Sequence, residues 1–480
     1  MATQKIKWNE KLKGVWDKTY FSLDINIYKT ITEQEKYRKD FIDNDSSLTE
    51  NEKKFLLDEL QKTYDTFRIV DNSVEKQHCN NCQNWHQATQ YCEFCVRKYL
   101  KNDFGNWTSG NNEIDKLIQE CQKKTIAPDI VIEWIEYDQF MNIEHLTEGG
   151  CATIYTATWK DGHYIKWNAE RQILERFGRR KIVLKRLNNS NNNNAHWFQE
   201  VTLSFTLDNT TQFLATYYGI TKDPTTQDYM LVLNYYQTDL RHFLKDNYHS
   251  LTLLQKHNII YKISWCLDEI HSQNIVHRDL HSRNILYNSQ NINWKISDLG
   301  LSGPVDKPFN SIYGNLPYIA PEVLCGKIYT TKSDIYSMGI LMWEVITGET
   351  PFDDCEHNLD LTLDIVKGYR PKIYEYISHE DMTLMKQCWD AYPDNRPHAI
   401  DIYEKIELLI DSFYNKDKQQ EPIIQSNKLK SKLNTRLSKN TESKIQNSKI
   451  FTFNIPIKPR NATDEEQLEM EQQYLKNIAP

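Results

Sequence analysis

The sequence predicts an α+β protein in which strand-forming segments precede helix-forming segments, with a small cysteine-rich module ahead of both. Apolar, β-branched runs that end at Lys185 and that span residues 229–236 predict strands. Apolar residues at three- and four-residue spacing over 253–276, and the apolar stretch 332–347, predict two long helices. Two Cys-x-x-Cys pairs within residues 78–95 mark the module.

The composition predicts a folded chain that does not work through overall positive charge. The chain has 480 residues, of which 39% are hydrophobic and 26% charged, so it can bury a sizeable core in two or three domains of about 150 residues each. The net charge of −8 argues against a protein that binds nucleic acid through its global charge.

The sequence contains no signal for membrane insertion or secretion. It has no apolar run of 18 residues or more, its N-terminus lacks an apolar secretory segment, and Ala2 excludes N-myristoylation. We therefore expect a cytoplasmic protein without membrane contact. A basic run over 428–439 would also permit nuclear entry or binding to acidic partners, although such runs are more often solvated tail.

The paired cysteines have the spacing of a metal site in a reducing compartment. A Cys-x-x-Cys turn directs two thiolates at one ion, and two such turns close a tetrahedral zinc site. Such a site leaves no open position for a substrate, so the expected role of Zn²⁺ is structural. The alternatives are four unrelated thiols, or replacement of one cysteine by His78 or His86. The expected zinc ligands are Cys79, Cys82, Cys92 and Cys95.

Three further motifs follow one another over 46 residues and carry the strongest functional signal. They are His-Arg-Asp-x-x-x-x-Asn at 277–284, Asp-Leu-Gly at 298–300 and Ala-Pro-Glu at 320–322. This order is typical of enzymes that transfer the γ-phosphoryl group of ATP, a reaction that needs in-line positioning and neutralised charge. Asp279 is then expected to orient the acceptor hydroxyl and take its proton, while Asn284 and Asp298 hold Mg²⁺ against the phosphates.

Residues 140–412 resemble a eukaryotic protein kinase of the tyrosine-kinase-like serine/threonine group. The resemblance rests on the three motifs, on Met-Trp-Glu at 342–344 and on Cys-Trp and Asn-Arg-Pro within 388–397. The cysteine pairs, with Trp-x-Ser-Gly at 107–110 and Trp-Ile-Glu-Tyr-Asp at 134–138, are similar to an expanded family of fungal kinases. The resemblance implies a bilobal protein-kinase fold, with a β-rich N-lobe and a helical C-lobe, that uses ATP and Mg²⁺ to phosphorylate protein substrates in intracellular signalling.

The resemblance also assigns residues to the nucleotide side of the site. Lys185 is expected to contact the α- and β-phosphates and to pair with Glu200 on the following helix. Segment 146–155 is the expected glycine-rich loop, although Thr147 and Ala152 replace two of its usual glycines. The expected nucleotide contacts in this loop and at the hinge between the lobes are Gly149, Gly150, Ile154, Leu233 and Tyr235.

Three structural expectations accompany the resemblance. Glu322 and Arg396 should form a buried ion pair, and Asp334 should brace the catalytic loop from below. Leu299 replaces the usual phenylalanine and, being apolar, should still pack.

Several features leave the acceptor residue and the activity open. His281 and Arg283 differ from the usual serine/threonine pattern, so a tyrosine-directed or dual-specificity kinase is an alternative. The altered glycine loop allows a catalytically weak pseudokinase or scaffold, and the cysteine module allows a zinc-dependent nucleic-acid binder, which the net charge disfavours. The expected activation-loop phosphorylation sites are Ser302, Ser311 and Tyr313.

The domain boundaries follow from these assignments. The first region should contain an amphipathic helix over 50–66, and a capping box could start it either between Ser47 and Glu50 or between Thr49 and Glu52. The last region is rich in Gln, Asn, Lys and Ser, which is typical of disorder. We expect a helical or irregular region at 1–70, a zinc-ribbon-like module at 71–102, a connector at 103–139, the kinase domain at 140–412 and a disordered tail at 413–480.

Overall fold

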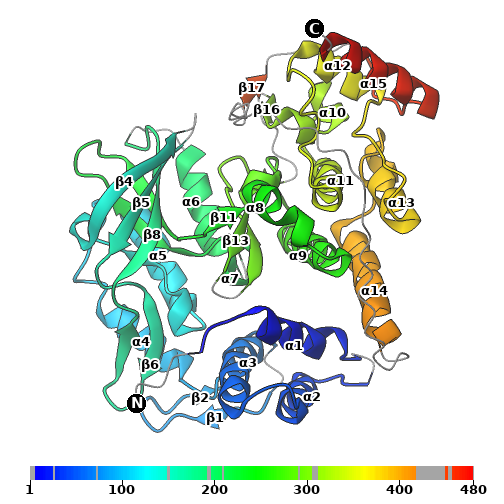
Figure 1. Ribbon diagram of the computed structural model, residues 1–480. Coiled ribbons are helices and arrows are strands. Elements are labelled where there is room, and N and C mark those ends of the chain that lie inside the picture. The colour runs from blue at the N-terminus through cyan, green and yellow to red at the C-terminus, as the bar shows by residue number, and fades with distance from the viewer. Residues whose placement is uncertain are drawn as a thin grey trace. The chain divides into compact units, whose positions relative to one another are not determined.

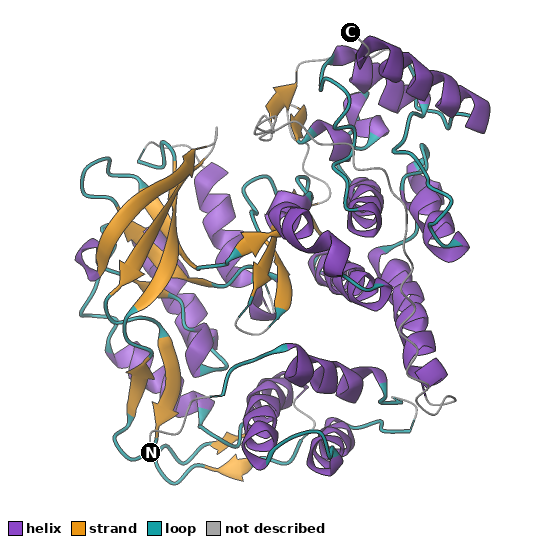
Figure 2. Cartoon of the chain, in the orientation of Figure 1, coloured by secondary structure: helices purple, strands orange, loops and turns teal. Residues whose placement is uncertain are grey.

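The computed structural model of the chain falls into two compact units (Figure 1, Figure 2). The first comprises Met1–Asp246, Trp265–His277 and Ser282–Pro304, and the second comprises Asn247–Ser264, Arg278–His281 and Val305–Pro480. The structure describes residues 6–24, 27–71, 74–148, 152–191, 196–207, 210–289, 292–304, 312–417, 449–451 and 457–478.

The first unit begins with three helices, α1 (Glu10–Phe21), α2 (Ile31–Asn44) and α3 (Glu50–Asp71). They share an apolar core that includes Leu12, Ile42 and Leu60. A capping box starts α3, because the Thr49 hydroxyl accepts a hydrogen bond from the Glu52 N–H and the Glu52 carboxylate accepts one from the Thr49 N–H. The predicted helix over 50–66 is therefore confirmed, and it extends to Asp71.

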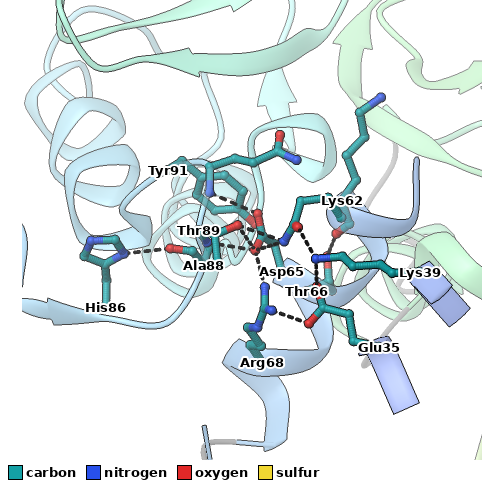
Figure 3. Close-up of polar contacts among 12 residues, drawn as sticks. Glu35, Lys39, Lys62, Asp65, Thr66, Arg68, His86, Ala88, Thr89 and Tyr91 are labelled. Carbon is teal, nitrogen blue, oxygen red and sulfur yellow. Dashed lines mark hydrogen bonds and ion pairs between the residues drawn. The ribbon is translucent and has the colours of Figure 1, made fainter. Parts of the chain in front are cut away.

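The cysteine module consists of β1 (Gln77–His78), β2 (Trp85–His86) and α4 (Glu93–Asn102). Figure 3 shows its attachment to α3 through the buried Asp65 carboxylate. This carboxylate accepts hydrogen bonds from the N–H groups of Thr89 and Gln90, at 2.7 and 3.1 Å, and from Arg68 at 3.0 Å. Removing a buried acceptor that serves several donors typically costs about 1–3 kcal/mol for each unsatisfied group, so Asp65 is a strong attachment point.

Residues 103–139 are packed into the first unit and do not form a separate connector. This segment contains α5 (Asn112–Lys124), whose buried Ile114 and Ile118 lie in the core of the sheet that follows. β3 (Glu133–Trp134) joins that sheet as an edge strand. The expected boundary at residue 139 therefore lies inside one folded unit.

A six-stranded sheet organises the rest of the first unit. Besides β3 it contains β4 (Phe140–Glu148), β5 (Ala152–Trp159), β8 (Arg180–Leu187), β9 (Tyr217–Lys222) and β10 (Tyr229–Asn234). The order is β3-β9-β10-β8-β5-β4, and all neighbours are antiparallel except β3 and β9. Gly219 permits the parallel pair, because a Cβ there would lie 1.9 Å from the Glu133 carbonyl oxygen.

The cysteine module packs against a hairpin that is inserted between β5 and β8. It consists of β6 (Tyr164–Asn168) and β7 (Ile173–Arg176). Trp167 and Leu174 of the hairpin share a buried cluster with Cys92 and Cys95 of the module. The hairpin thus joins the module to the sheet.

Shorter elements complete the first unit. The helices are α6 (His196–Thr206), α7 (Thr210–Phe213), α8 (Leu240–Asn247), η1 (Pro128–Ile130), η2 (Tyr137–Gln139) and η4 (Ser282–Asn284). A three-stranded sheet contains β11 (Thr238–Asp239), β13 (Ile285–Asn288) and β14 (Asn293–Ile296), and β12 (Ile275–Val276) pairs with β15 (Gly303–Pro304).

The second unit is mainly helical, so the predicted order of a strand-rich part before a helical part is confirmed. Its helix α11 (Thr331–Thr347) is buried from Ser333 to Thr347, as its apolar sequence predicts. Among its described residues, β16 (Ile312–Gly314) pairs with β17 (Lys449–Phe451). The other helices are the first part of α9 (Leu253–Ser272), α10 (Pro321–Leu324), α12 (Leu359–Lys367), α13 (His379–Cys388), α14 (Ala399–Asp417), α15 (Asp464–Ile478), η3 (Tyr248–Ser250), η5 (Leu316–Tyr318) and η6 (Pro393–Asn395).

The expected disordered tail at 413–480 is wrong in its described parts. α14 continues to Asp417, β17 pairs with β16, and α15 packs on the end of α12. The polar composition of the tail predicted disorder because it cannot form a core of its own. Here the tail segments gain order by docking on the second unit, which composition does not reveal.

No helix among the described residues is both long enough and apolar enough to span a bilayer.

A buried ion pair fixes the segment that follows β16. The Arg396 side chain, which is 1% exposed, donates hydrogen bonds to both Glu322 carboxylate oxygens at 2.7 and 2.8 Å. The Ser333 hydroxyl donates to the same carboxylate at 3.0 Å. The predicted Glu322–Arg396 pair is therefore confirmed.

Glu322→Gln should destabilise the protein by about 3–5 kcal/mol, because it leaves the Arg396 charge buried without a counter-ion. Denaturant unfolding of the full chain, followed by tryptophan fluorescence, measures the change. Glu120→Gln is the matched control, since Glu120 pairs with Lys123 on an exposed helix surface and should not change the midpoint measurably. Equal midpoints for the two variants would contradict the assignment.

Candidate active site

Lys185, Glu200 and Asp298 meet in the first unit and form the centre of the candidate site. Lys185 lies on β8, Glu200 on α6, and Asp298 in the loop after β14. Lys185 Nζ lies 2.6 Å from Glu200 Oε1 and 2.7 Å from Asp298 Oδ1. The predicted Lys185–Glu200 pair is present, and Asp298 joins it.

Burial and charge act in opposite directions on these groups. Burial alone would lower the pKa of Lys185, but the Asp298 and Glu200 carboxylates outweigh it and raise that pKa well above its ordinary value. The surrounding protein partly desolvates the Asp298 carboxyl and so opposes its ionisation, yet Lys185 outweighs this effect and lowers the pKa of Asp298 to about 2. The site therefore holds a charged lysine and an ionised aspartate at neutral pH.

Asp298 is the member of the cluster that faces open space. Its side chain is 43% exposed, whereas those of Lys185 and Glu200 are 8% and 7% exposed. Its backbone has a φ of +66°, and its Oδ1 accepts a hydrogen bond from the Gly300 N–H at 3.1 Å. Leu299 is buried, as expected for its packing role. An exposed, ionised carboxylate is the type of ligand that Mg²⁺ prefers.

Helix α6, which carries Glu200, is held from behind by α5. Val201 and Phe205 of α6 share a buried cluster with Ile114 and Ile118 of α5. The Cys121 thiol of α5 also lies 3.5 Å from the Phe205 carbonyl oxygen. This contact could not be predicted from the sequence, because the apolar stripe of α5 fits any apolar partner.

Asp279 belongs to the second unit, where the backbone of its neighbours is fixed. Arg278 has a φ of +70°, and its N–H donates a hydrogen bond to Asp334 Oδ1 at 2.9 Å. Asp334 is 1% exposed, so the expected brace is present. His281 Nε2 lies 3.7 Å from Asp279 Oδ2, and a Cβ on Gly314 would lie 3.4 Å from Asp279 Oδ1.

The remaining predicted nucleotide contacts lie on the sheet or next to it. Ile154 of β5 is opposite Lys185, and Leu233 of β10 is opposite Val183 of the same β8 strand. Tyr235 follows β10, and its ring lies 4.1 Å from Lys181 Nζ. Asn284 is buried in the first unit, and its carbonyl oxygen accepts the Ser297 N–H at 2.8 Å. Gly149 and Gly150 lie outside the described residues.

The three expected phosphorylation sites have different outcomes. Ser302 is 3% exposed, and its hydroxyl donates a hydrogen bond to the His277 carbonyl oxygen at 3.1 Å. This burial contradicts its assignment as an exposed acceptor, since a kinase cannot reach it. Tyr313 lies on β16, and Ser311 lies outside the described residues.

The four paired cysteines also come together. Their sulfur atoms all lie within 4.8 Å of one another, and the Cys79–Cys95 and Cys82–Cys92 sulfur distances are both 3.6 Å. Four sulfurs about 2.3 Å from a tetrahedral zinc ion would be about 3.8 Å apart, so this donor set fits Zn²⁺. The first pair flanks the β1–β2 turn, and the second begins α4, where a second turn had been expected.

The four cysteine sulfurs come together without a histidine among them, and a ligand atom of His86 lies within 4.8 Å of those of Cys92 and Glu93. His86 Nδ1 lies 2.9 Å from the Ala88 carbonyl oxygen, and the His78 ring lies against Trp85. Asp65, which attaches the module to α3, had no recognisable sequence signal, because the residues that it binds lie 24 and 25 positions away.

Residues 140–406, more than half of the chain, match the family model of protein tyrosine and serine/threonine kinases. The chain belongs to this family.

Similar proteins include growth factor receptors and a serine/threonine-protein kinase. Fibroblast growth factor receptor 1 of Dugesia japonica is 39% identical over 164 residues, which are 33% of this chain and 18% of that protein. "Probable serine/threonine-protein kinase roco8" of Dictyostelium discoideum is 38% identical over 149 residues, 29% of this chain and 8% of that protein. Platelet-derived growth factor receptor alpha of Homo sapiens is 33% identical over 177 residues, 36% and 16% of the two chains. This chain therefore spans less than a fifth of the length of each of these three relatives.

The pKa of Asp298 makes a prediction for acid unfolding. A carboxyl whose folded pKa lies near 2, against an ordinary value of 3.8, adds stability above pH 3.8 that is lost as the pH falls through 2. Asp298→Asn removes this titration, so its free energy of unfolding should fall less steeply between pH 4 and pH 2 than that of the unaltered protein.

Urea midpoints measured at half-unit pH steps test this expectation. Asp353→Asn, at an exposed aspartate, is the control and should follow the unaltered protein. If Asp298→Asn follows the same slope as Asp353→Asn, the charge coupling between Lys185 and Asp298 is absent.

Proposed function

We propose that the protein transfers the γ-phosphoryl group of ATP to serine and threonine hydroxyls of other proteins in intracellular signalling. The observation that carries this proposal is the buried Lys185 ammonium bound to both Glu200 and Asp298. Phosphoryl transfer requires the lysine, its paired glutamate and the metal-binding aspartate to be in place together. Family membership supports the same reaction.

Each residue has a proposed part in the reaction. Lys185 binds the α- and β-phosphates, and Glu200 keeps its side chain extended. Asp298 and Asn284 are the proposed Mg²⁺ ligands, and the bound ion would neutralise charge that develops on the phosphates. Asp279 orients the acceptor hydroxyl and takes its proton. Ile154, Leu233 and Tyr235 are proposed to line the nucleotide site.

Tyrosine-directed or dual-specificity transfer is the second candidate. His281 lies beside the proposed base, where it can contact an acceptor side chain, and Arg283 follows it. Growth factor receptors are also among the similar proteins. Serine/threonine transfer is favoured by the motif pattern from His277 to Asn284 and by the serine/threonine-protein kinase among the relatives.

We also propose that the four paired cysteines bind a structural Zn²⁺ ion. The sulfur distances support a tetrahedral site, and burial raises the pKa of Cys95 to about 11, so bound metal would have to displace its proton. Thiolate ligands require a reducing compartment, which favours the cytoplasm. The cysteine pairs and the segments at 107–110 and 134–138 also support the proposed kinship to fungal kinases.

Asp279→Asn should lower phosphoryl transfer by about 10²- to 10⁴-fold while Mg·ATP binding is retained, because the base is lost and the phosphate contacts are not. The assay uses the full chain with Mg²⁺ and labelled ATP, followed by phosphoamino-acid analysis. Asp353→Asn is the matched control. Label on tyrosine alone would replace the serine/threonine proposal with the second candidate. ATP binding without any label would indicate a pseudokinase. Unchanged activity in Asp279→Asn would contradict the role of Asp279 as the base.

Cys95→Ser should reduce zinc from about one ion per chain to nearly none, measured by elemental analysis of protein purified without chelator. Cys325→Ser is the control, because Cys325 lies in the second unit, outside the cluster. Equal metal content in the two variants would remove the zinc proposal.

A further inference from the structure

The tail strand β17 pairs with β16, and one end of β16 lies beside Asp279, the proposed base. β17 pairs antiparallel with β16, so that Tyr313 is opposite Ile450 and Gly314 is opposite Lys449. At this end of β16, a Cβ on Gly314 would lie 3.4 Å from Asp279 Oδ1. Paired strands lie about 4.8 Å apart, so the segment paired with β16 is one strand away from Gly314, which lies beside the Asp279 carboxylate.

Helix α15 anchors the tail on the second unit. Gln467 is bonded at both ends of its amide: Oε1 accepts the Arg370 N–H at 3.1 Å, and Nε2 donates to the Gly368 carbonyl oxygen. The Tyr474 ring stacks on Tyr369, with the ring centroids 5.4 Å apart. These contacts join α15 to the end of α12 and the residues that follow it.

The described part of the segment between β17 and α15 also makes close contacts with the second unit. The Arg460 N–H donates to the Val366 carbonyl oxygen at 3.1 Å, and Asn461 Oδ1 accepts the Ala391 N–H at 2.9 Å. A Cβ on Gly368, whose φ is +108°, would lie 2.2 Å from the Ala462 nitrogen. Only glycine at this position leaves room for the tail to cross.

We propose that β16 is a docking edge for an extended peptide substrate, and that residues 449–451 of the chain's own tail occupy this edge as a competitor. This proposal rests on the proposed phosphoryl transfer, in which Asp279 is the base. Pairing with a strand edge binds a peptide through main-chain hydrogen bonds, so one edge accepts many sequences. The tail therefore needs no resemblance to a substrate beyond an extended backbone.

The anchor explains how so short a strand can compete. Three paired residues make few hydrogen bonds and would bind weakly as a free peptide. The tether converts their binding into an intramolecular event, at the high effective concentration that a short linker provides. Weakening the anchor on α15 should therefore free the edge without altering a residue of the catalytic site. Modification or binding of α15 would regulate substrate access by the same route.

The test compares two substitutions on the same helix in the full chain. Gln467→Ala removes the anchoring amide, and Gln472→Ala changes an exposed glutamine that makes no described contact with α12. The probe is a fluorescent peptide of residues 445–455, titrated without nucleotide and followed by anisotropy. We expect the peptide to bind Gln467→Ala about tenfold more tightly than either the unaltered protein or Gln472→Ala, because two partly buried hydrogen bonds of the anchor are lost.

Substitutions in β17 give an independent test. Ladder hydrogen bonds alternate along an antiparallel pair, so Lys449→Pro or Ile450→Pro must remove one of them. At least one of the two proline variants should bind the peptide more tightly than the unaltered protein, and its KM for ATP should be unchanged. Ile450→Val is the control, because it keeps the backbone N–H and should behave as the unaltered protein. Equal peptide affinity in all variants would overturn the proposal.

The outcomes separate this proposal from the proposed reaction. If Gln467→Ala binds the peptide more tightly but the protein transfers no phosphate, the docking edge is retained and the proposed phosphoryl transfer is overturned. Phosphate transfer without any gain in peptide affinity in Gln467→Ala or in the proline variants would retain the reaction and overturn the tail as competitor.

Discussion

The pairing of one buried lysine with two carboxylates constrains the first unit more than any other interaction. Lys185 can reach Glu200 only if α6 stays close to β8, and it can reach Asp298 only if the loop after β14 adopts its left-handed backbone. A charge at this depth without its partners would be strongly destabilising. The packing of α5 against α6 therefore belongs to the same constraint, since it keeps Glu200 within reach.

In the second unit, buried charges hold the chain segment beside Asp279 in a fixed path. Asp334 receives the N–H of the preceding Arg278, and the Glu322–Arg396 pair fixes the helix that follows the activation segment. Both anchors are buried charges satisfied by several donors, and such groups tolerate little movement. β16 lies between these fixed points and can therefore present a regular edge to an extended chain.

The sequence predicted the parts of the site whose chemistry needs particular residues at short, fixed spacing. Asp279, Asn284 and Asp298 belong to one such run, and the two cysteine pairs to another. Contacts between distant segments escaped prediction: Asp65 with Thr89, α5 with α6, and α15 with α12. Polar composition predicted disorder for the tail because it measures what a segment can bury alone. Ser302 escaped because a loop hydroxyl looks the same in sequence whether it is exposed or buried.

The hairpin of β6 and β7 has a practical consequence for the boundaries of the protein. Trp167 and Leu174 lie inside the matched kinase segment, yet their apolar partners include Cys92 and Cys95, upstream of it. Ile114 and Ile118 likewise complete a core whose other half is the sheet. A recombinant fragment trimmed to residues 140–406 would expose both surfaces to water and to other copies, and such patches promote aggregation. We therefore expect the smallest fragment that folds on its own to be longer than the segment that matches the family model.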